Sequence, residues 1–417
     1  MHFEDSLAFA REKDGLDELT PYREQFHYPK DSLYFCGHSL GLQARKVKES
    51  VAVELDKWSQ IGVEGHFNGE RPWLNFHTFL TPHLAKLVGG KEEEVVACNS
   101  LTTNLHLLMV SFYQPKGKKC KIVIEKGAFP SDRYAVLSQL KYHGFDESCL
   151  LEIEGDDNDF ISNSAFATFF EEHHEEIALV LLGGVNYLSG QCFPLSYVGE
   201  LCRKYDFVYG LDLAHAAGNV VLDLHEWQVD FAVWCSYKYL NGGPGTVGGM
   251  FVHQKHHTKD LPRFEGWWGN KESNRFLMND EFDPAESVEA WQLSNAPVVS
   301  MASLLPSLEF FSEVGMQKLR KKSIELTSYL EFLLVDKLQD QVRVLTTKDI
   351  DSRGAQLSFV INGFTKQKVD EMANEKIYFD WRESRHGGLI RMAPMPFYNS
   401  FEDVYRVVDV LVSKVKK

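Results

Sequence analysis

Short apolar runs alternate with helix-length segments through the first three hundred residues of this chain. Six of the runs are typical of buried strands: residues 94–98, 121–125, 177–182, 207–213, 230–236 and 248–253. Four of the segments between them are long enough for helices: residues 102–112, 131–142, 164–175 and 197–204. This alternation predicts an α/β fold with a mainly parallel sheet that is sandwiched by helices.

The N-terminal stretch does not share this alternation. It is loop-rich to about Gln43, after which apolar residues recur at helical spacing across 44–60. We therefore expect an amphipathic helix there, entering the large α/β part of the chain.

The texture changes again from Pro297. A long helical zone over residues 300–339 leads to short apolar runs and a last helix, which is the pattern of an α+β domain. The runs cover residues 342–347, 355–361, 376–382 and 389–394. The predicted division is an N-terminal segment that contributes to the small domain (1–43), a large cofactor-binding domain (44–300) and a small C-terminal α+β domain (301–417).

Composition narrows the classes of function. The 417 residues include 44 basic and 59 acidic side chains, a net charge of −15, which argues against a nucleic-acid-binding surface. No run approaches the roughly 18 apolar residues of a membrane span, and the N-terminus is acidic where a signal peptide is basic. We expect a cytoplasmic protein that does not bind membranes.

The spacing of cysteines and histidines indicates neither a disulfide framework nor a metal site. The seven cysteines are an odd number, sparse, and contain no CxxC pair, so a disulfide framework is not expected. No HExxH or Cys/His spacing indicates a metal site, and we predict none.

The strongest chemical signal is a pair of opposite charges at neighbouring strand ends. Asp212 ends one apolar run, and Lys238 follows the next, beside Tyr237 and a glycine-rich loop. Ligands of open α/β sheets bind beyond the carboxyl ends of the strands. The pair fits pyridoxal 5'-phosphate, whose aldehyde forms a Schiff base with a lysine and whose ring nitrogen needs a carboxylate. Taken singly, Asp212 is more simply a helix cap and Lys238 a solvated loop lysine, but the two together in this context favour the cofactor.

Two strand-to-helix turns supply weaker signals. Residues 99–102 open a helix with free N–H groups and a hydroxyl, suited either to a phosphate or to an ordinary cap. In the second turn, Phe129 has the ring to stack on a pyridine and Asp132 the carboxylate to bond a ring substituent. Otherwise Phe129 packs in a loop and Asp132 favours the helix dipole.

Together these motifs closely resemble the kynureninase family, pyridoxal-phosphate enzymes of fold type I, class V aminotransferase-like. The resemblance runs from YFCGHSLGLQ (34–43) through SLTTNLH, FPSD, DLAHAAGN, WCSYKYLNGGPG, EGWWGN and LSNAP to GGLIRMAPMPFYNS (387–400). It implies hydrolytic Cβ–Cγ cleavage of L-kynurenine, 3-hydroxy-L-kynurenine or both, in tryptophan degradation or NAD biosynthesis.

The same resemblance implies roles for individual residues. The catalytic set is Lys238, Tyr237 and Asp212. The cofactor-binding set is Leu101, Thr102, Phe129, Pro130, Ser131, Asp132, Asp212, His215, Tyr237, Lys238, Trp267 and Asn295. The substrate-binding set is His66, Ser294, Asn295 and Arg391, with Arg391 clamping the α-carboxylate.

The resemblance also implies an assembly. Trp267 and Asn295 would reach the phosphate from the neighbouring subunit of a homodimer with shared active sites.

Two positions fit the resemblance less securely. Gly183 stands where some relatives have a hydroxyl, so a phosphate contact is not expected there. Arg391 also has the ordinary interpretation of a structural salt bridge.

Two alternatives stay open at this point, a class V aminotransferase and a catalytically dead binding module, whereas a cysteine desulfurase is not favoured. A class V aminotransferase has the same lysine and aspartate; a cysteine desulfurase needs a downstream cysteine, and none follows Cys235. A catalytically dead binding module on this fold would not need Lys238 and Asp212. The preference between kynurenine and its 3-hydroxy form, the catabolic or biosynthetic role, and Tyr237 as acid–base group or phosphate ligand are not decided by the sequence.

Overall fold

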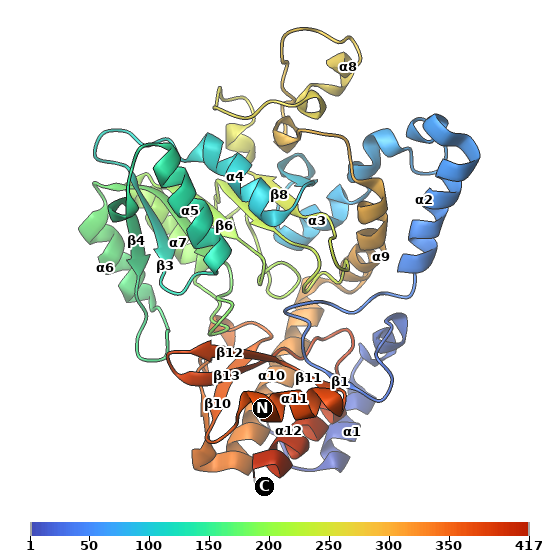
Figure 1. Cartoon of the computed structure of the whole chain (residues 1–417), viewed down its shortest axis with the longest axis vertical. Helices are drawn as coiled ribbons and strands as arrows, with labels where there is room; N and C mark the ends of the chain where they lie inside the picture. Colours follow the sequence, from blue (N-terminus) through green and yellow to red (C-terminus); the bar gives the residue numbers. More distant parts are fainter. Residues whose placement is uncertain (1, 416–417) are drawn as a thin grey trace.

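A seven-stranded sheet forms the centre of the larger part of the structure, a computed structural model that describes residues 2–415 (Figure 1). In spatial order the strands are β2 (Val95–Ala97), β8 (Gly249–Val252), β7 (Phe231–Trp234), β6 (Val208–Asp212), β5 (Ile177–Gly183), β3 (Lys121–Glu125) and β4 (Leu150–Ile153). Only β8 runs antiparallel to its neighbours. The predicted α/β fold class with a mainly parallel sheet is confirmed.

Both faces of this sheet are buried, as the continuous apolar runs predict. In β5, Leu179 and Leu181 enter one hydrophobic cluster, whereas Val180 and Leu182 enter another. The first cluster also holds residues of α4 (Leu101–Phe112) and α5 (Pro130–Tyr142). The second cluster holds residues of α3 (Thr81–Val88), α6 (Asn163–His173), α7 (Leu195–Tyr205) and α9 (Val298–Val314).

All six predicted strand runs form strands, and the structure adds β4, which the sequence reasoning missed. The first three residues of β4 are only half-buried, so its sequence LLEI lacks the long apolar run of its neighbours. The helix expected over residues 44–60 is α2 (Val47–Ile61), which packs on α9. The short α8 (Glu272–Arg275) lies in a segment that projects from the top of the large part (Figure 1).

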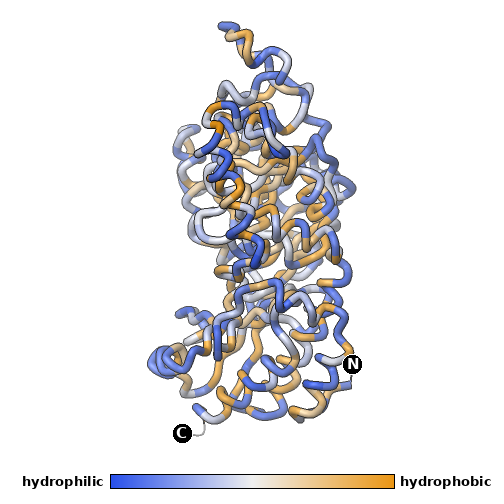
Figure 2. Tube along the Cα trace, turned by 90° about the vertical axis from the view of Figure 1, so that its right-hand side faces the viewer, coloured by the Kyte–Doolittle hydropathy of each residue, from blue (hydrophilic) through white to orange (hydrophobic). Residues whose placement is uncertain are grey.

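The smaller part is α+β. Its four-stranded antiparallel sheet has the order β12 (Asp380–Ser384), β13 (Gly387–Met392), β10 (Leu357–Ile361) and β9 (Val342–Val344). Its helices are α10 (Met316–Leu338), α11 (Lys366–Asn374) and α12 (Phe401–Val415). Seen from the side, hydrophobic residues run through the interior of both parts (Figure 2).

The N-terminal segment contacts both parts: Ala10 and Phe35 enter the core of the smaller part, whereas Leu19, Phe26 and Leu42 enter a core of the larger one. Residues 7–16, expected to be loop, form α1 (Leu7–Leu16), which packs against α12, and β1 (Leu33–Tyr34) pairs in parallel with β11 (Ile377–Tyr378). Only Ala10 of α1 is buried, so the helix leaves a weak apolar pattern in the sequence.

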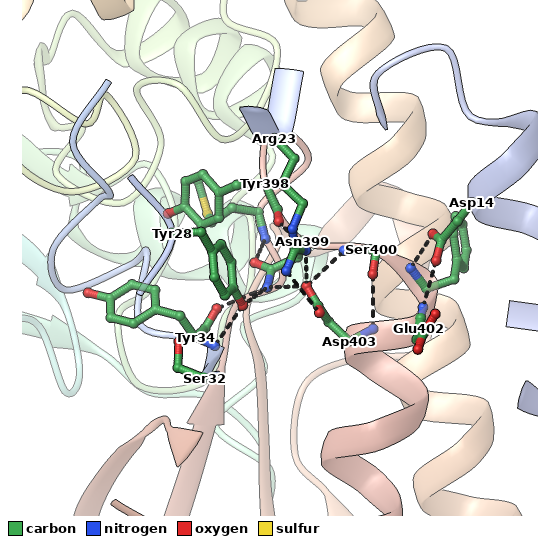
Figure 3. A network of polar contacts seen from close by, with 12 residues as sticks. Asp14, Arg23, Tyr28, Ser32, Tyr34, Tyr398, Asn399, Ser400, Glu402 and Asp403 are labelled. Carbon is green, nitrogen blue, oxygen red and sulfur yellow. Dashed lines mark hydrogen bonds and ion pairs between the residues drawn. The ribbon is translucent and has the colours of Figure 1, made fainter. Parts of the chain in front are cut away.

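A polar network joins α1 to the start of α12 (Figure 3). The two carboxylate oxygens of Asp14 accept the backbone N–H groups of Phe401 and Glu402 at 2.6 and 2.9 Å. Asp403 accepts the N–H of Ser400 and pairs with Arg23. The N-terminal segment thus caps the last helix of the chain.

This network borders a cavity of about 1020 Å³. Asp14, Arg23 and Asp403 on its wall are already paired with one another or with backbone. None of the helices within residues 2–415 has the length and apolar character needed to cross a membrane.

Candidate active site

The carboxyl ends of three parallel strands meet at one edge of the large sheet. Glu125 ends β3, and Gly183 and Asp212 end β5 and β6 directly opposite each other in register. Lys238 lies in the loop after β7. A cavity opens at this edge, lined by Leu101, Thr102, Glu125, Phe129, Ser131, Asp132, Gly183, Val185, Tyr187, Asp212, Ala214, His215, Cys235, Tyr237 and Lys238.

Aromatic rings surround the Lys238 amine. Its Nζ lies 5.7 Å from the ring centroid of Phe129 and 6.0 Å from that of Tyr237. The segment before Gln43 closes over this loop, because the Gly41 N–H donates to the Tyr237 carbonyl at 2.8 Å. A Cβ on Gly41 would stand 2.4 Å from the Lys238 carbonyl oxygen, so only glycine permits this approach.

Three buried carboxyl groups face the cavity. Asp212 accepts the Ala214 N–H at 2.7 Å, and its charge acts on the neighbouring carboxyl group of Asp132. Glu125 accepts the Gly183 N–H at 3.2 Å. Burial raises the pKa of all three, that of Asp132 also through repulsion by Asp212, and that of Glu125 to about 7. A cation placed beside Asp212 would stabilise its charged form.

Two buried imidazoles lie behind this cluster. Their ring centroids, in His215 and His38, are 6.4 Å apart. Burial, together with the positive charges of Lys238 and Arg391, lowers the pKa of both histidines well below its usual value. Both are therefore neutral at pH 7, and the His215 ring is available as an uncharged hydrogen-bonding group.

The opposite end of the cavity suits an anion. Leu101 and Thr102 begin α4, after Ser100 at its N-cap and Asn99 with a positive φ of 48°. Pro130 and Ser131 begin α5, and the hydroxyls of Thr102 and Ser131 lie 3.1 Å apart. Free N–H groups at the start of α4 and two hydroxyls thus lie together, a typical phosphate environment. Gly183 lies instead beside Asp212, at the carboxylate end.

The site fits pyridoxal phosphate on these grounds. Asp132 Oδ1 and His215 Nδ1 are buried without a hydrogen-bond partner among residues 2–415, and both belong to residues lining the cavity. Unpaired buried polar atoms are costly, so a ligand with polar ring substituents would satisfy them. Burial raises the pKa of Tyr237, so its phenol stays protonated and is suited to donate to a phosphate.

The other predicted residues lie outside the cavity. His66 bonds the Val63 carbonyl at 3.0 Å, and Ser294 and Asn295 are exposed in the loop before α9. The Trp267 indole N–H donates to the Arg275 carbonyl at 2.7 Å, within its own chain. Within the described chain, these four residues do not meet Lys238, and their roles remain predictions.

Arg391 is also absent from the cavity wall but lies close behind it. It is buried, forms an ion pair with Asp380, and stands 5.7 Å from the Tyr187 ring centroid. Tyr187 packs edge to face on Phe129 at 5.2 Å. One tyrosine therefore separates the arginine from the ring-stacking position.

Sequence reasoning missed Glu125, Tyr187 and His38. Glu125 ends an apolar strand as Asp212 does, and that signal was available. Tyr187 and His38 lie in irregular loops with no periodicity to mark them.

One group of metal-type ligands lies elsewhere, at the far ends of β2 and β8. Glu94 accepts the Lys91 and Gln254 N–H groups at 2.9 and 2.8 Å and bonds His225 at 2.9 Å. His253 completes the group. The carboxylate is thus occupied by protein donors.

Glu125 makes stability depend on pH. Its pKa rises from 4.5 to about 7 on folding, so between these values the folded protein holds a proton that the unfolded chain has lost. Stability must then fall as pH rises through this window, by about 3 kcal/mol in total for this group. Glu125→Gln should remove the loss and be more stable than wild type at pH 8, with little difference at pH 4.5.

The measurement is urea unfolding of the cofactor-free protein at both pH values. Glu371→Gln, on the exposed face of α11, is the matched control. Equal pH slopes for wild type and Glu125→Gln would show that Glu125 is ionised in the folded state.

Comparisons with known proteins agree on one family. Residues 319–411 match the family described as the kynureninase C-terminal domain. The chain is 48% identical over 419 residues to a kynureninase of Myxococcus xanthus, covering 98% of this chain and 97% of the relative. It is 44% identical over 423 residues to a kynureninase of Christiangramia forsetii, covering 99% and 98%.

Solved structures show the same fold at low identity. A cysteine desulfurase from Thermococcus onnurineus, in its apo form, superposes with a TM-score of 0.78 at 16% identity, covering 95% of this chain and 98% of that one. A C-DES variant with glycine linked covalently to its pyridoxal-phosphate cofactor has a TM-score of 0.76 at 19% identity, covering 94% and 98%. These likenesses establish the fold and leave the reaction to the sequence relatives.

Proposed function

Since the chain belongs to the kynureninase family, we propose that it hydrolyses the Cβ–Cγ bond of L-kynurenine, 3-hydroxy-L-kynurenine or both. The products are L-alanine and anthranilate or 3-hydroxyanthranilate. The enzyme is a hydrolase with pyridoxal phosphate as its cofactor. The observation that carries this proposal is the nearly full-length identity with kynureninases.

We propose that the cavity holds the cofactor between its two chemically distinct ends. Leu101, Thr102, Ser131 and Tyr237 would bind the phosphate, and Phe129 would stack on the ring. Asp132, Asp212 and His215 would bond the polar groups of the ring. Bound pyridoxal phosphate supplies an electron sink for the negative charge that forms beside the breaking bonds of the substrate.

The chain's own groups then move protons and hold charges. Lys238 would hold the cofactor through its Nζ, and the same amine, when not bound to the cofactor, would be the base for the substrate Cα proton. Asp212 keeps the ring nitrogen protonated through its negative charge. The protonated Tyr237 phenol is suited to deliver a proton later in the cycle, and Arg391 holds the α-carboxylate.

Two spectroscopic measurements test the proposal together. The purified protein should show a cofactor absorption band that shifts with borohydride, and it should release fluorescent anthranilate on addition of L-kynurenine. A class V aminotransferase would instead form pyruvate from an amino-acid donor. Absence of both the band and the fluorescence would overturn the assignment.

We also propose a homodimer that acts in the cytoplasm, in tryptophan degradation or NAD biosynthesis, since the substrate derives from tryptophan. Large apolar side chains on two surfaces support the dimer: Trp58, Val63 and Phe67 around the end of α2, and Phe276, Leu277 and Met278 beside α8. Val63 is 70% exposed and Met278 66%. Exposed apolar patches of this kind are typical of protein–protein interfaces. Trp267 precedes the second of these surfaces by nine residues in the sequence, and neither Trp267 nor Asn295 lines the cavity of its own chain.

Subunit mixing tests whether active sites are shared. One protein carries Lys238→Ala, and the other carries Trp267→Ala with Asn295→Ala; each alone is expected to be inactive. Hybrid dimers would place both lesions in one site and leave the other site intact, so activity should reappear after subunit exchange. If exchange is proven by mass spectrometry and activity does not return, each site is built from a single chain.

A further inference from the structure

The guanidinium of Arg391 is held from two sides. Its Nε donates to Asp380 Oδ2 at 2.6 Å, and its Nη2 lies 2.5 Å from the same oxygen. Its Nη1 donates to the Tyr187 carbonyl at 2.5 Å. Only 3% of the Arg391 side chain is exposed, so these contacts determine its orientation.

The pairing of strands places Asp380 where it can do this. β12 and β13 are antiparallel, and Asp380 stands directly opposite Arg391 in their register. Side chains directly opposite each other on an antiparallel pair share a face of the sheet. Asp380 also accepts the Nε of Arg382 at 3.0 Å, so its carboxylate is fixed between two arginines.

These contacts leave part of the guanidinium unused. Arginine has five N–H groups, and the three bonds above leave one on Nη1 and one on Nη2. Two terminal N–H groups of this kind form the fork that binds a second carboxylate side by side. An arginine side chain without these contacts would be flexible, and it would lose conformational entropy when it became ordered on a bound carboxylate.

The remaining fork lies close to the reaction centre. The guanidinium carbon of Arg391 stands 5.7 Å from the Tyr187 ring centroid, and Tyr187 packs on Phe129. The Phe129 centroid is 5.7 Å from Lys238 Nζ. The positive charges of Arg391 and Lys238 both act on His38 and His215. The guanidinium is thus one side chain away from the cavity.

We propose that Asp380 is the positioning residue for the substrate's α-carboxylate. It aligns Arg391, together with the Tyr187 carbonyl, so that the two terminal N–H groups are presented to the substrate before it binds. Asp380 itself does not touch the substrate. This inference rests on the proposed function, because it concerns how the same substrate is held.

An opposite role for Asp380 predicts an opposite result. If its carboxylate merely occupies the place of the substrate's carboxylate and must leave, removing it would tighten substrate binding. If it positions Arg391, removing it weakens binding. The sign of the change in KM therefore separates the two roles.

The experiment uses the holoenzyme with L-kynurenine. Asp380→Ala should raise KM about 10- to 100-fold, the range expected when a positioning contact is lost, with kcat within about threefold of wild type. Inhibition by kynurenamine, the substrate without its α-carboxylate, should be unchanged, because that ligand makes no use of Arg391. Glu383→Gln, on the exposed part of β12, is the matched control and should behave as wild type.

A double-mutant cycle checks that the effect passes through the arginine. In an Arg391→Ala background, adding Asp380→Ala should change KM by less than about twofold, since no guanidinium is left to align. If Asp380→Ala does not fold, Asp380→Asn, which keeps an oxygen acceptor and the side-chain shape, carries the same comparison with a smaller rise in KM.

The outcomes are distinguishable from failure of the proposed function. A wild-type protein that does not cleave kynurenine defeats the function itself. An active wild type with an unchanged or lower KM in the Asp380 variants, or with kynurenamine inhibition weakened as strongly as kynurenine binding, overturns the positioning role alone.

Discussion

Lys238→Ala is expected to abolish multiple turnover while the protein folds and still binds its cofactor non-covalently. Lys238 follows β7 at the sheet edge where β6 ends in Asp212, and its amine faces the Phe129 ring. A methyl group can neither hold the cofactor nor accept the Cα proton, the two roles proposed for this amine. Anthranilate fluorescence over many turnovers measures the loss, and circular dichroism checks the fold.

A matched lysine makes this result specific. Lys118→Ala, in an exposed turn before β3, should leave turnover and the absorption band unchanged. Mass spectrometry after borohydride reduction should locate the adduct on Lys238 in wild type. An adduct on another lysine, or normal turnover in Lys238→Ala, would refute the assignment.

The second large effect is expected for Asp212→Asn, which should lower kcat by about 100- to 1,000-fold, as when one preorganised electrostatic contact is removed. The structural role of Asp212 is to accept the Ala214 N–H. An asparagine oxygen keeps that acceptor, so the substitution removes the charge and preserves the turn. Steady-state kinetics beside thermal unfolding separate the two roles, and activity within a factor of two of wild type would mean that Asp212 is only a cap.

The strand-end chemistry was predictable because it depends on local sequence. Asp212 and Lys238 follow apolar strands that are sequential neighbours, and parallel strands bring such ends to one edge. Burial on both faces likewise followed from uninterrupted apolar runs. Half-buried β4 and weakly patterned α1 lacked that signal, and both were missed.

The rest of the site depends on contacts between distant segments. Tyr187 and His38 come from irregular loops, and their approach to Phe129 and His215 is decided by packing. The pairing of Asp380 with Arg391 depends on the register of a hairpin, since a shift of one residue would turn Asp380 to the other face. The sequence named Arg391 by resemblance and left its partner unnamed.

The cap that Asp14 places on α12 has a consequence for the order of folding. Asp14 accepts a hydrogen bond from the Phe401 N–H, and these two residues are 387 positions apart. The contact therefore closes a very long loop. The entropy lost in closing a loop grows with its length, whereas the strands of the large sheet come from one continuous stretch of sequence. The large sheet is therefore able to form during synthesis, whereas α1 can pack on α12 only after α12 has been synthesised. The core of the smaller part therefore forms late, and its apolar residues stay exposed until α12 has been synthesised.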